Sequence, residues 1–207
     1  MGAAGAALRP AILLDRDGTL IDVVRDEETG TVHVAFHPSQ LRLLPRVVEG
    51  LVLLREAGFA FAIATNQPGP AKGQIAVAAV ERTNAALLAM LGEAGIAVEA
   101  VRACMHHPEG GTGGEASLVT SCDCRKPKPG LLRGLMTDLG LDPAQTWMVG
   151  DAVSDVEAAH AAGIRSALLF ATNRCELCPL RRRPEGHMPR VCGPDMLAVA
   201  RAILAER

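Results

Sequence analysis

Carboxylate and small polar side chains follow three apolar runs of the sequence: Asp15, Asp17, Thr65, Asn66, Gln67 and Asp151. Ligands of open parallel sheets bind beyond the carboxyl ends of the strands, so these residues are expected at one edge of a sheet. Asp15 and Asp17 are two residues apart, and on a turning chain one can face a bound phosphate while the other reaches its leaving oxygen. Gly18 allows the sharp turn that this requires.

The same carboxylates predict a site for a hard cation. Clustered carboxylates repel each other at neutral pH unless a cation neutralises them, and oxygen ligands favour magnesium. Asp15 and Asp17, completed by Asp151, would form such a site. Alternatively, Asp17-Gly18 is simply a turn, which is common for one such dipeptide. The occurrence of polar residues after three separate runs argues against that alternative.

Soft metal ligands form two close pairs: Cys104, His106, Cys122 and Cys124. Such pairs, separated by a 15-residue gap at 107–121, favour a closed tetrahedral zinc site. A closed site leaves no position for water, so we expect it to be structural and to fix the segment leading into Arg125 and Lys126. Four unrelated buried residues are the alternative, and His107 is a lesser alternative ligand.

A second set of soft ligands lies near the end of the chain: Cys175, Cys178, His187 and Cys192. These four could close a second zinc site that pins the connection before the last helix. Reduced thiols packed against the sheet, with His187 exposed, are the alternative, because cysteine is often simply buried. A thioredoxin-like redox role is disfavoured, since the Cys-x-x-Cys pair does not open a helix at a first βαβ unit.

Short apolar runs alternate with helical patterns, and this alternation must position the polar groups. Strands are expected at residues 11–14, 59–64, 96–103, 147–150 and 164–170. Helices are expected between Pro45, suited to a first turn, and the stop at Gly58, and at 74–91, 129–139, 153–162 and 196–204. The repeat of strand and helix predicts an α/β fold, a doubly wound (Rossmann-like) parallel sheet with helices on both faces.

Two segments interrupt the alternation, residues 21–40 and the Gly-rich residues 108–121. Both are expected to be loops or flaps over a sheet edge, with a hairpin at 31–36 in the first. The intervals between the polar segments leave no room for a large cap domain. We expect a single domain over 1–207, with a core at about 11–170 and a cysteine-containing loop and helix at 171–207.

The composition favours small-molecule chemistry. A chain of 207 residues that is 49% hydrophobic and 21% charged can bury a core. A formal net charge of −2 supplies no broad positive field for nucleic acid or anionic membranes. No apolar stretch approaches the ~20 residues that span a bilayer, and the first ten residues lack a basic leader. We therefore expect a cytoplasmic monomer that binds a small molecule and neither nucleic acid nor membrane.

Four segments resemble, in order and spacing, the motifs of the haloacid dehalogenase-like phosphatases: Asp-Arg-Asp-Gly-Thr-Leu at 15–20, Thr-Asn-Gln at 65–67, Arg-Lys-Pro at 125–127 and Gly-Asp-Ala-Val-Ser-Asp at 150–155. The resemblance covers about residues 12–169. Within that superfamily, the cysteine and histidine pattern before Arg125 looks like that of the zinc-containing heptose 1,7-bisphosphate phosphatases and related histidinol-phosphatase domains.

The resemblance implies a magnesium-dependent phosphatase with a covalent intermediate. Asp15 would form an aspartyl-phosphate, while Asp17 would act first as general acid and then as general base. Magnesium would be held by Asp15, Asp151 and the backbone carbonyl of Asp17.

The remaining motif residues are implied to bind the phosphorylated substrate. Thr65 and Lys126 would hold the phosphoryl oxygens, and Asp155 would orient Lys126 or a magnesium-bound water. Three further residues would contact the substrate: Asn66, Gln67 and Arg125. Arg125 would reach beyond the transferred phosphate.

The chain departs from the heptose-phosphatase pattern beside two motifs. Residues 68–73 read Pro-Gly-Pro-Ala-Lys-Gly where those enzymes have Ser-Gly-Ile-Ala-Arg-Gly, and Ala152 stands where a basic residue is frequent. Heptose 1,7-bisphosphate is the expected substrate; histidinol phosphate, another sugar phosphate or a nucleotide is the alternative. Transfer of the phosphoryl group to another metabolite also stays open. Retention of Asp15 and Asp17 disfavours a non-catalytic zinc-stabilised phosphate-binding module.

Overall fold

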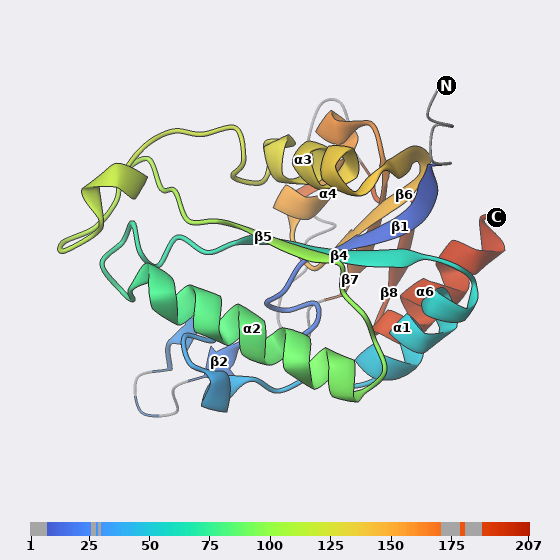
Figure 1. Cartoon of the computed structure of the whole chain (residues 1–207), viewed down its shortest axis with the longest axis horizontal. Helices are drawn as coiled ribbons and strands as arrows, with labels where there is room; N and C mark the ends of the chain where they lie inside the picture. The colour runs from blue at the N-terminus through green and yellow to red at the C-terminus, as the bar shows by residue number, and fades with distance from the viewer. Residues whose placement is uncertain (1–7, 26–27, 29, 171–178, 181–187) are drawn as a thin grey trace, which may run out of the picture.

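The computed structural model describes residues 8–25, 28, 30–170, 179–180 and 188–207 (Figure 1). Its centre is a six-stranded sheet in the order β5-β4-β1-β6-β7-β8. Every neighbouring pair in this sheet is parallel. The strands are β1 Arg9–Leu14, β4 Ala60–Asn66, β5 Ala100–Cys104, β6 Leu141–Gly150, β7 Arg165–Leu169 and β8 Val191–Gly193.

Helices cover both faces of the sheet, as the alternation predicts. They are α1 Val47–Glu56, α2 Val77–Glu93, α3 Gly130–Leu139, α4 Val153–Ala162 and α6 Met196–Ala205. Ile12 and Leu14 of β1 belong to the core shared with α1, α2 and α6, whereas Ala11 and Leu13 belong to the core shared with α3 and α4. Because both faces are covered, the central strands are continuous apolar runs. The predicted fold class is confirmed.

Helices α1 and α6 pack closely on one face of the sheet (Figure 1). Val47, Leu51 and Leu54 recur on the buried side of α1. Gly50 lies on the same side, and a Cβ built there would be 2.6 Å from the backbone carbonyl of Met196 in α6. The absence of a side chain at position 50 therefore sets the distance between the two helices.

Several boundaries differ from the sequence prediction. Strand β6 begins six residues early because Leu141 pairs with Arg9, although the residues after Leu141 are partly exposed and carry no apolar pattern. Strand β5 begins only at Ala100, and α2 at Val77. Strand β8, which was not predicted, has three residues, too few to show a period.

The chain segments outside these layers are a small hairpin and a long loop. Strands β2 Val24–Arg25 and β3 Val32–His33 pair antiparallel, so the expected hairpin at 31–36 is wrong in position. Residues 34–36 instead run on toward the short 3-10 helix Pro38–Gln40. The loop after β5 carries a second 3-10 helix, Ala116–Leu118. In Figure 1 it extends past the end of β4 before it returns to α3.

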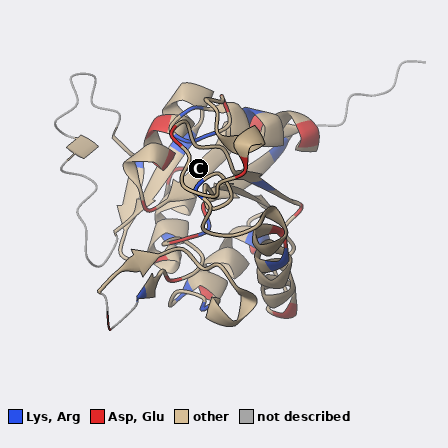
Figure 2. Ribbon diagram, turned by 90° about the vertical axis from the view of Figure 1, so that its left-hand side faces the viewer, with Lys and Arg blue, Asp and Glu red and all other residues tan. Residues whose placement is uncertain are grey.

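Figure 2 views the molecule from the side toward which β4 and β5 run, with lysines and arginines interspersed among aspartates and glutamates. Among the described residues, no helix has the length and apolar character needed to cross a membrane.

Candidate active site

Asp15, Gly18 and Asp151 meet at the carboxyl edge of the sheet. The backbone N–H of Asp15 donates to the Val149 carbonyl oxygen at 2.9 Å, which extends the pairing of β1 with β6 by one residue. Gly18 has a φ of +78°, a conformation that glycine adopts without strain. A Cβ at this position would lie 2.3 Å from Asp151 Oδ2. Glycine at position 18 therefore allows the turn after β1 to approach the loop after β6.

The ammonium group of Lys126 is buried between two carboxylates. Its Nζ lies 2.8 Å from Asp15 Oδ1 and 2.6 Å from Asp155 Oδ1, and it donates to the Ala64 carbonyl oxygen at 2.7 Å. Burial alone lowers the pKa of Lys126, but the charges of Asp15 and Asp155 outweigh it and hold that pKa above its ordinary value. Lys126 is therefore a fixed cation beside Asp15.

Asn66 holds the backbone of Lys126 in this position. Its Nδ2 donates to the Lys126 carbonyl oxygen at 2.9 Å, and its Oδ1 accepts from the Lys126 N–H at 3.0 Å. The last residue of β4 thereby anchors the segment that precedes α3. The oxygen and one N–H of the Asn66 amide are therefore engaged by the Lys126 backbone.

Three carboxylates surround the same point. Asp15, Asp151 and Asp155 each offer an oxygen atom, and these atoms all lie within 4.8 Å of one another. Burial, followed by the charges of Asp15 and Asp155, raises the pKa of Asp151 to about 7. Burial also raises the pKa of Asp155 to about 6, although Lys126 opposes this shift. Carboxylate oxygens gathered in this way are the ligand atoms that magnesium prefers.

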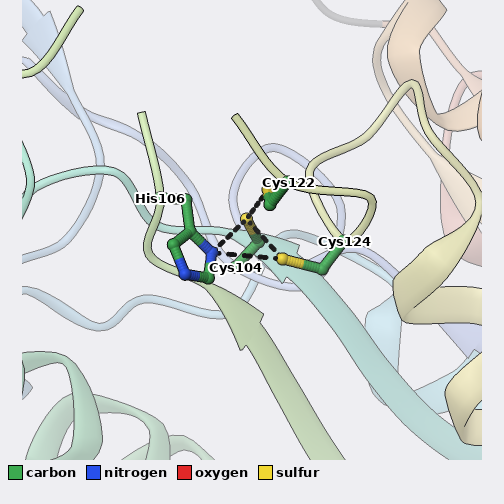
Figure 3. A group of neighbouring side chains, drawn as sticks. All are labelled: Cys104, His106, Cys122 and Cys124. Atoms are coloured by element: carbon green, nitrogen blue, oxygen red, sulfur yellow. Dashed lines mark hydrogen bonds between the residues drawn. The ribbon is translucent and has the colours of Figure 1, made fainter. Parts of the chain in front are cut away.

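The four predicted zinc ligands also converge on one point, shown in Figure 3. Cys104 Sγ lies 3.6 Å from Cys122 Sγ and 3.1 Å from Cys124 Sγ, and His106 Nδ1 lies 3.7 Å from Cys104 Sγ and 3.3 Å from Cys124 Sγ. A tetrahedral ion with Zn–S bonds of about 2.3 Å holds its ligand atoms about 3.5–3.8 Å apart. The side chains are thus already close to the spacing of a zinc site.

Comparison with known proteins identifies the family. A profile of the HAD-hydrolase-like family matches residues 123–189. The D-glycero-beta-D-manno-heptose-1,7-bisphosphate 7-phosphatase of Pseudomonas aeruginosa is 34% identical over 196 residues, which cover 95% of this chain and 98% of that protein. The protein of the same name from Escherichia coli (strain K12) is 33% identical over 165 residues, 80% of this chain and 81% of that one. The chain belongs to the haloacid dehalogenase-like phosphatases.

Solved structures agree with this membership of the HAD-like phosphatases. A crystal structure of D,D-heptose 1,7-bisphosphate phosphatase from B. bronchiseptica, complexed with magnesium and phosphate, is 30% identical with a TM-score of 0.75 and covers 96% of this chain and 99% of that one. The phosphatase of the same name from Burkholderia Thailandensis is 23% identical with a TM-score of 0.63, and it shares the fold. The predicted family and the prediction of a phosphatase are confirmed.

In this HAD-like phosphatase, Asp17 lies in a hydrogen-bond network with Arg16 and Gln67. Arg16 Nε donates to Asp17 Oδ2 at 2.9 Å, and Gln67 Nε2 donates to the same oxygen at 2.7 Å. Gln67 Nε2 also lies 3.0 Å from Thr65 Oγ1, to which it donates. Asp17, Thr65 and Gln67 are therefore brought together. Arg16 was missed because its position between two acidic residues suits an exposed side chain equally well.

Arg125 and the second set of soft ligands are the remaining predicted site residues. Arg125 is half-buried, and its Nη1 lies 3.5 Å from the His106 carbonyl oxygen, beside the cysteine cluster. Of the second set of soft ligands, Cys175, Cys178 and His187 lie outside the described residues. Cys192 lies in β8 and packs against a small cluster that includes Leu168 and Leu180.

Proposed function

We propose that this phosphatase hydrolyses heptose 1,7-bisphosphate through a phosphorylated Asp15. The substrate is supported by the relatives of that name, one of which matches the chain over nearly its whole length. The mechanism is supported by the position of Asp15, whose carboxylate is held beside a buried cation and beside two further carboxylates. The arrangement of Asp15 with Lys126 and Asp155 is the observation that carries the proposal.

The chemistry requires one nucleophile and one proton carrier. A carboxylate oxygen of Asp15 attacks phosphorus in line, and the bond from phosphorus to the leaving oxygen breaks as Asp17 gives its proton to that oxygen. Asp17 then removes a proton from water, which attacks phosphorus, releases phosphate and restores the Asp15 carboxylate.

Lys126 and Thr65 supply donors to the phosphoryl oxygens. Lys126 has three N–H donors, which the free enzyme directs to Asp15, Asp155 and the Ala64 carbonyl. The donor directed at Asp15 is the one that a phosphoryl oxygen can take over as Asp15 becomes esterified. Thr65 accepts from Gln67 through its hydroxyl oxygen, so its own hydrogen is available to the phosphoryl group.

Asp15, Asp151 and the backbone carbonyl of Asp17 would hold magnesium. The fit rests on the close approach of the carboxylate oxygens and is supported by the pKa of Asp151, which burial and then the charges of Asp15 and Asp155 raise. When bound, the ion supplies screening between the anionic nucleophile and the anionic substrate. The Asp17 side chain itself is directed to Arg16 and Gln67.

Cys104, His106, Cys122 and Cys124 are proposed to bind one structural zinc ion. The distances among their ligand atoms support this assignment, since all four converge within reach of one tetrahedral ion. Zinc would fix the start of the segment that continues into Arg125 and Lys126. Asn66 fixes that segment from the other side through the Lys126 backbone.

Arg125 is proposed to bind the phosphate that is not cleaved. It is half-buried and follows the zinc ligand Cys124 directly, so a fixed zinc loop would limit where its guanidinium can reach. Asn66 is proposed to fix the Lys126 backbone and to contact the substrate through the second N–H of its amide. Gln67 was expected to contact the substrate, but its amide contacts Arg16, Asp17 and Thr65, so it is proposed to act through Asp17.

We propose a cytoplasmic monomer. Thiolate ligands such as Cys104 must stay reduced to bind zinc, which suits a reducing compartment. Exposed large hydrophobic residues in the described part of the chain are few and come from separate segments: Leu8, Val32, Val119, Phe170 and Met188. Light scattering on the purified protein tests the monomer.

A phosphate-release assay tests the proposed function. The substrates are heptose 1,7-bisphosphate, histidinol phosphate, a hexose phosphate and a nucleoside monophosphate, each with magnesium and with a chelator. We expect the highest kcat/KM for the bisphosphate and no turnover in chelator. A higher kcat/KM for any monophosphate would contradict the substrate assignment, and undiminished turnover in chelator would contradict the metal requirement. Arg125→Ala is expected to lower kcat/KM for the bisphosphate more than for a monophosphate.

A further inference from the structure

Arg16 is a fully buried arginine at the centre of the site. Only 1% of its surface is exposed, and in the sequence it lies between Asp15, the proposed nucleophile, and Asp17, the proposed acid. A buried guanidinium is costly unless its charge is paired and its N–H groups are hydrogen-bonded. The contacts of Arg16 show which groups pair with its charge and accept from its N–H groups.

The guanidinium of Arg16 holds both oxygens of the Asp17 carboxylate. Arg16 Nε donates to Oδ2 at 2.9 Å and Nη2 donates to Oδ1 at 3.1 Å, a two-point contact that fixes the plane of the carboxylate. Oδ2 also accepts from Gln67 at 2.7 Å, whereas the second donor to Oδ1, the Ala35 N–H, is 3.4 Å away. Oδ1 is therefore the less tightly held oxygen of Asp17.

The other N–H groups of Arg16 are fixed from three separate segments. Asn84 of α2 accepts from Nη1 at 2.8 Å. The two N–H groups of Nη2 are shared among Asp17 Oδ1, the Ala35 carbonyl oxygen at 3.1 Å and Gln67 Oε1 at 3.0 Å. The guanidinium consequently cannot rotate without breaking contacts to α2, to the segment after β3 and to the residue after β4.

We propose that Arg16 is the positioning residue for Asp17, holding the carboxylate so that Oδ1 carries the proton to the leaving oxygen. The inference deepens the proposed function and rests on the role of Asp17 given there. A fixed carboxylate matters only where a proton must be delivered. Loss of Arg16 therefore damages the cleavage of a poor leaving group much more than the cleavage of a good one.

Leaving-group dependence tests the proposal. Glycerol 1-phosphate leaves as an alkoxide that needs a proton, whereas p-nitrophenyl phosphate leaves as a stabilised phenolate. General acid catalysis contributes roughly 10²–10⁴-fold, so we expect Arg16→Met to lose about 10- to 100-fold in kcat on glycerol 1-phosphate and less than about 3-fold on p-nitrophenyl phosphate. Arg16→Lys keeps the charge but not the two-point contact, so we expect an intermediate loss with the same selectivity. Equal losses on both substrates in folded Arg16→Met, as a merely structural role would give, overturn the inference.

Three further variants complete the test. Asp17→Asn is expected to show the same leaving-group selectivity as Arg16→Met, but more strongly. An equal loss on both substrates in Asp17→Asn would refute the proposed acid, and the inference with it, whereas a selective Asp17→Asn beside a non-selective Arg16→Met refutes the inference alone. If Arg16→Met does not fold, Asn84→Ala, which removes the acceptor of Arg16 Nη1, is the deciding variant. A loss in kcat of about 3-fold or more on glycerol 1-phosphate but not on p-nitrophenyl phosphate supports the inference, and the absence of such a selective loss overturns it. Arg9→Met, which breaks an exposed ion pair with Glu99, is the matched control and keeps both rates.

Discussion

One ammonium group and three carboxylates lie close together at the site, so the charge of each depends on the others. The ammonium of Lys126 contacts the carboxylates of Asp15 and Asp155, and Asp151 lies close to both carboxylates. Three carboxylates and one ammonium leave a formal charge of −2 when all are ionised, which matches a divalent cation. The raised pKa of Asp151 has the same origin, since burial and its acidic neighbours both disfavour its negative charge.

The covalent role of Asp15 is testable with one isosteric change. Asp15→Asn keeps the size of the side chain but replaces the nucleophilic carboxylate by an amide, so phosphate release is expected to fall by at least about 10⁴-fold. The melting temperature is expected to change little, because the variant weakens the contact with Lys126 but also removes one of the charges that repel Asp151. Asp138→Asn, at an exposed carboxylate paired with Arg102, is the control that keeps full activity. Appreciable turnover by folded Asp15→Asn would disprove the covalent mechanism.

The central strands and helices can be predicted from the sequence, because the spacing of apolar residues within each segment shows which side of it is buried. The apolar runs of β1 and β4 and the helical spacing of Val47, Leu51 and Leu54 each report burial on a defined side. The start of β6 could not be predicted, because Leu141 joins the sheet through pairing with Arg9, distant in sequence. The same limit applies to strand β8.

Part of the candidate site could likewise be predicted from the sequence, and part could not. Asp15, Thr65 and Asp151 could be placed at one edge because each follows a strand-like run. The two-point contact of Arg16 with Asp17, and the hold of Asn66 on the Lys126 backbone, could not be predicted because they depend on how separate loops meet. Such contacts decide which groups of the Asn66 and Gln67 side-chain amides remain available to a substrate.

The contact between α1 and α6 is expected to tolerate no added methyl group. Gly50→Ala gains up to about 1 kcal/mol in helix propensity, but its Cβ would press on the Met196 backbone, where overpacking costs about 1–3 kcal/mol. We therefore expect a net loss in the free energy of unfolding, measured in urea. Gly92→Ala in α2 is the matched control, since a Cβ there meets nothing within 4 Å and should stabilise the protein slightly. A gain in stability for Gly50→Ala would contradict this account of the packing.

The proposed zinc site in the loop between Cys104 and Cys124 is expected to affect catalysis only by positioning Arg125 and Lys126. Cys122→Ser removes one of four proposed ligands, so the zinc content per chain should fall below that of the wild type and kcat should fall as Lys126 and Arg125 lose their support. Plasma emission analysis of the purified protein measures the zinc, and magnesium titration should give nearly the wild-type affinity. Full zinc content in Cys122→Ser would show that this cysteine is not a ligand.

Metal counting also settles the second set of cysteines. One zinc per chain, unchanged by Cys178→Ser, supports simple packing of the thiols. Two zinc ions that fall to one in Cys178→Ser support a second site.

Considered as a whole, the molecule gathers several chain segments at one sheet edge. The loop after β5 meets the segment after β4, where the Glu115 N–H donates to the Pro70 carbonyl at 3.0 Å. The segment after β3 reaches the same edge through Ala35, which contacts both Arg16 and Asp17. Since each segment brings charge or ligands to a shared site, the stability of the whole protein is linked to the ions and protons bound there.

That linkage gives a prediction for stability against pH. The carboxyl groups of an unfolded chain titrate near pH 4, whereas the pKa of Asp151 is about 7 and that of Asp155 about 6 in the folded, metal-free protein. Between these values the folded state binds more protons than the unfolded state, so raising the pH from about 4 to about 7 removes stability. Magnesium binding offsets the repulsion but must displace protons when the pH lies below these pKa values.

We therefore expect the melting temperature of chelator-treated protein to carry a destabilising contribution that grows from about pH 5 to about pH 7.5. The rise in melting temperature caused by magnesium is expected to be larger at about pH 8 than at about pH 5.5, because the ion no longer competes with protons. Differential scanning calorimetry over this range, with and without magnesium, measures both effects. Asp151→Asn removes the group with the largest shift, so it should flatten the dependence in chelator and abolish most of the magnesium effect. A magnesium effect that is equal at both pH values in the wild type would show that the carboxylate cluster is not where the ion binds.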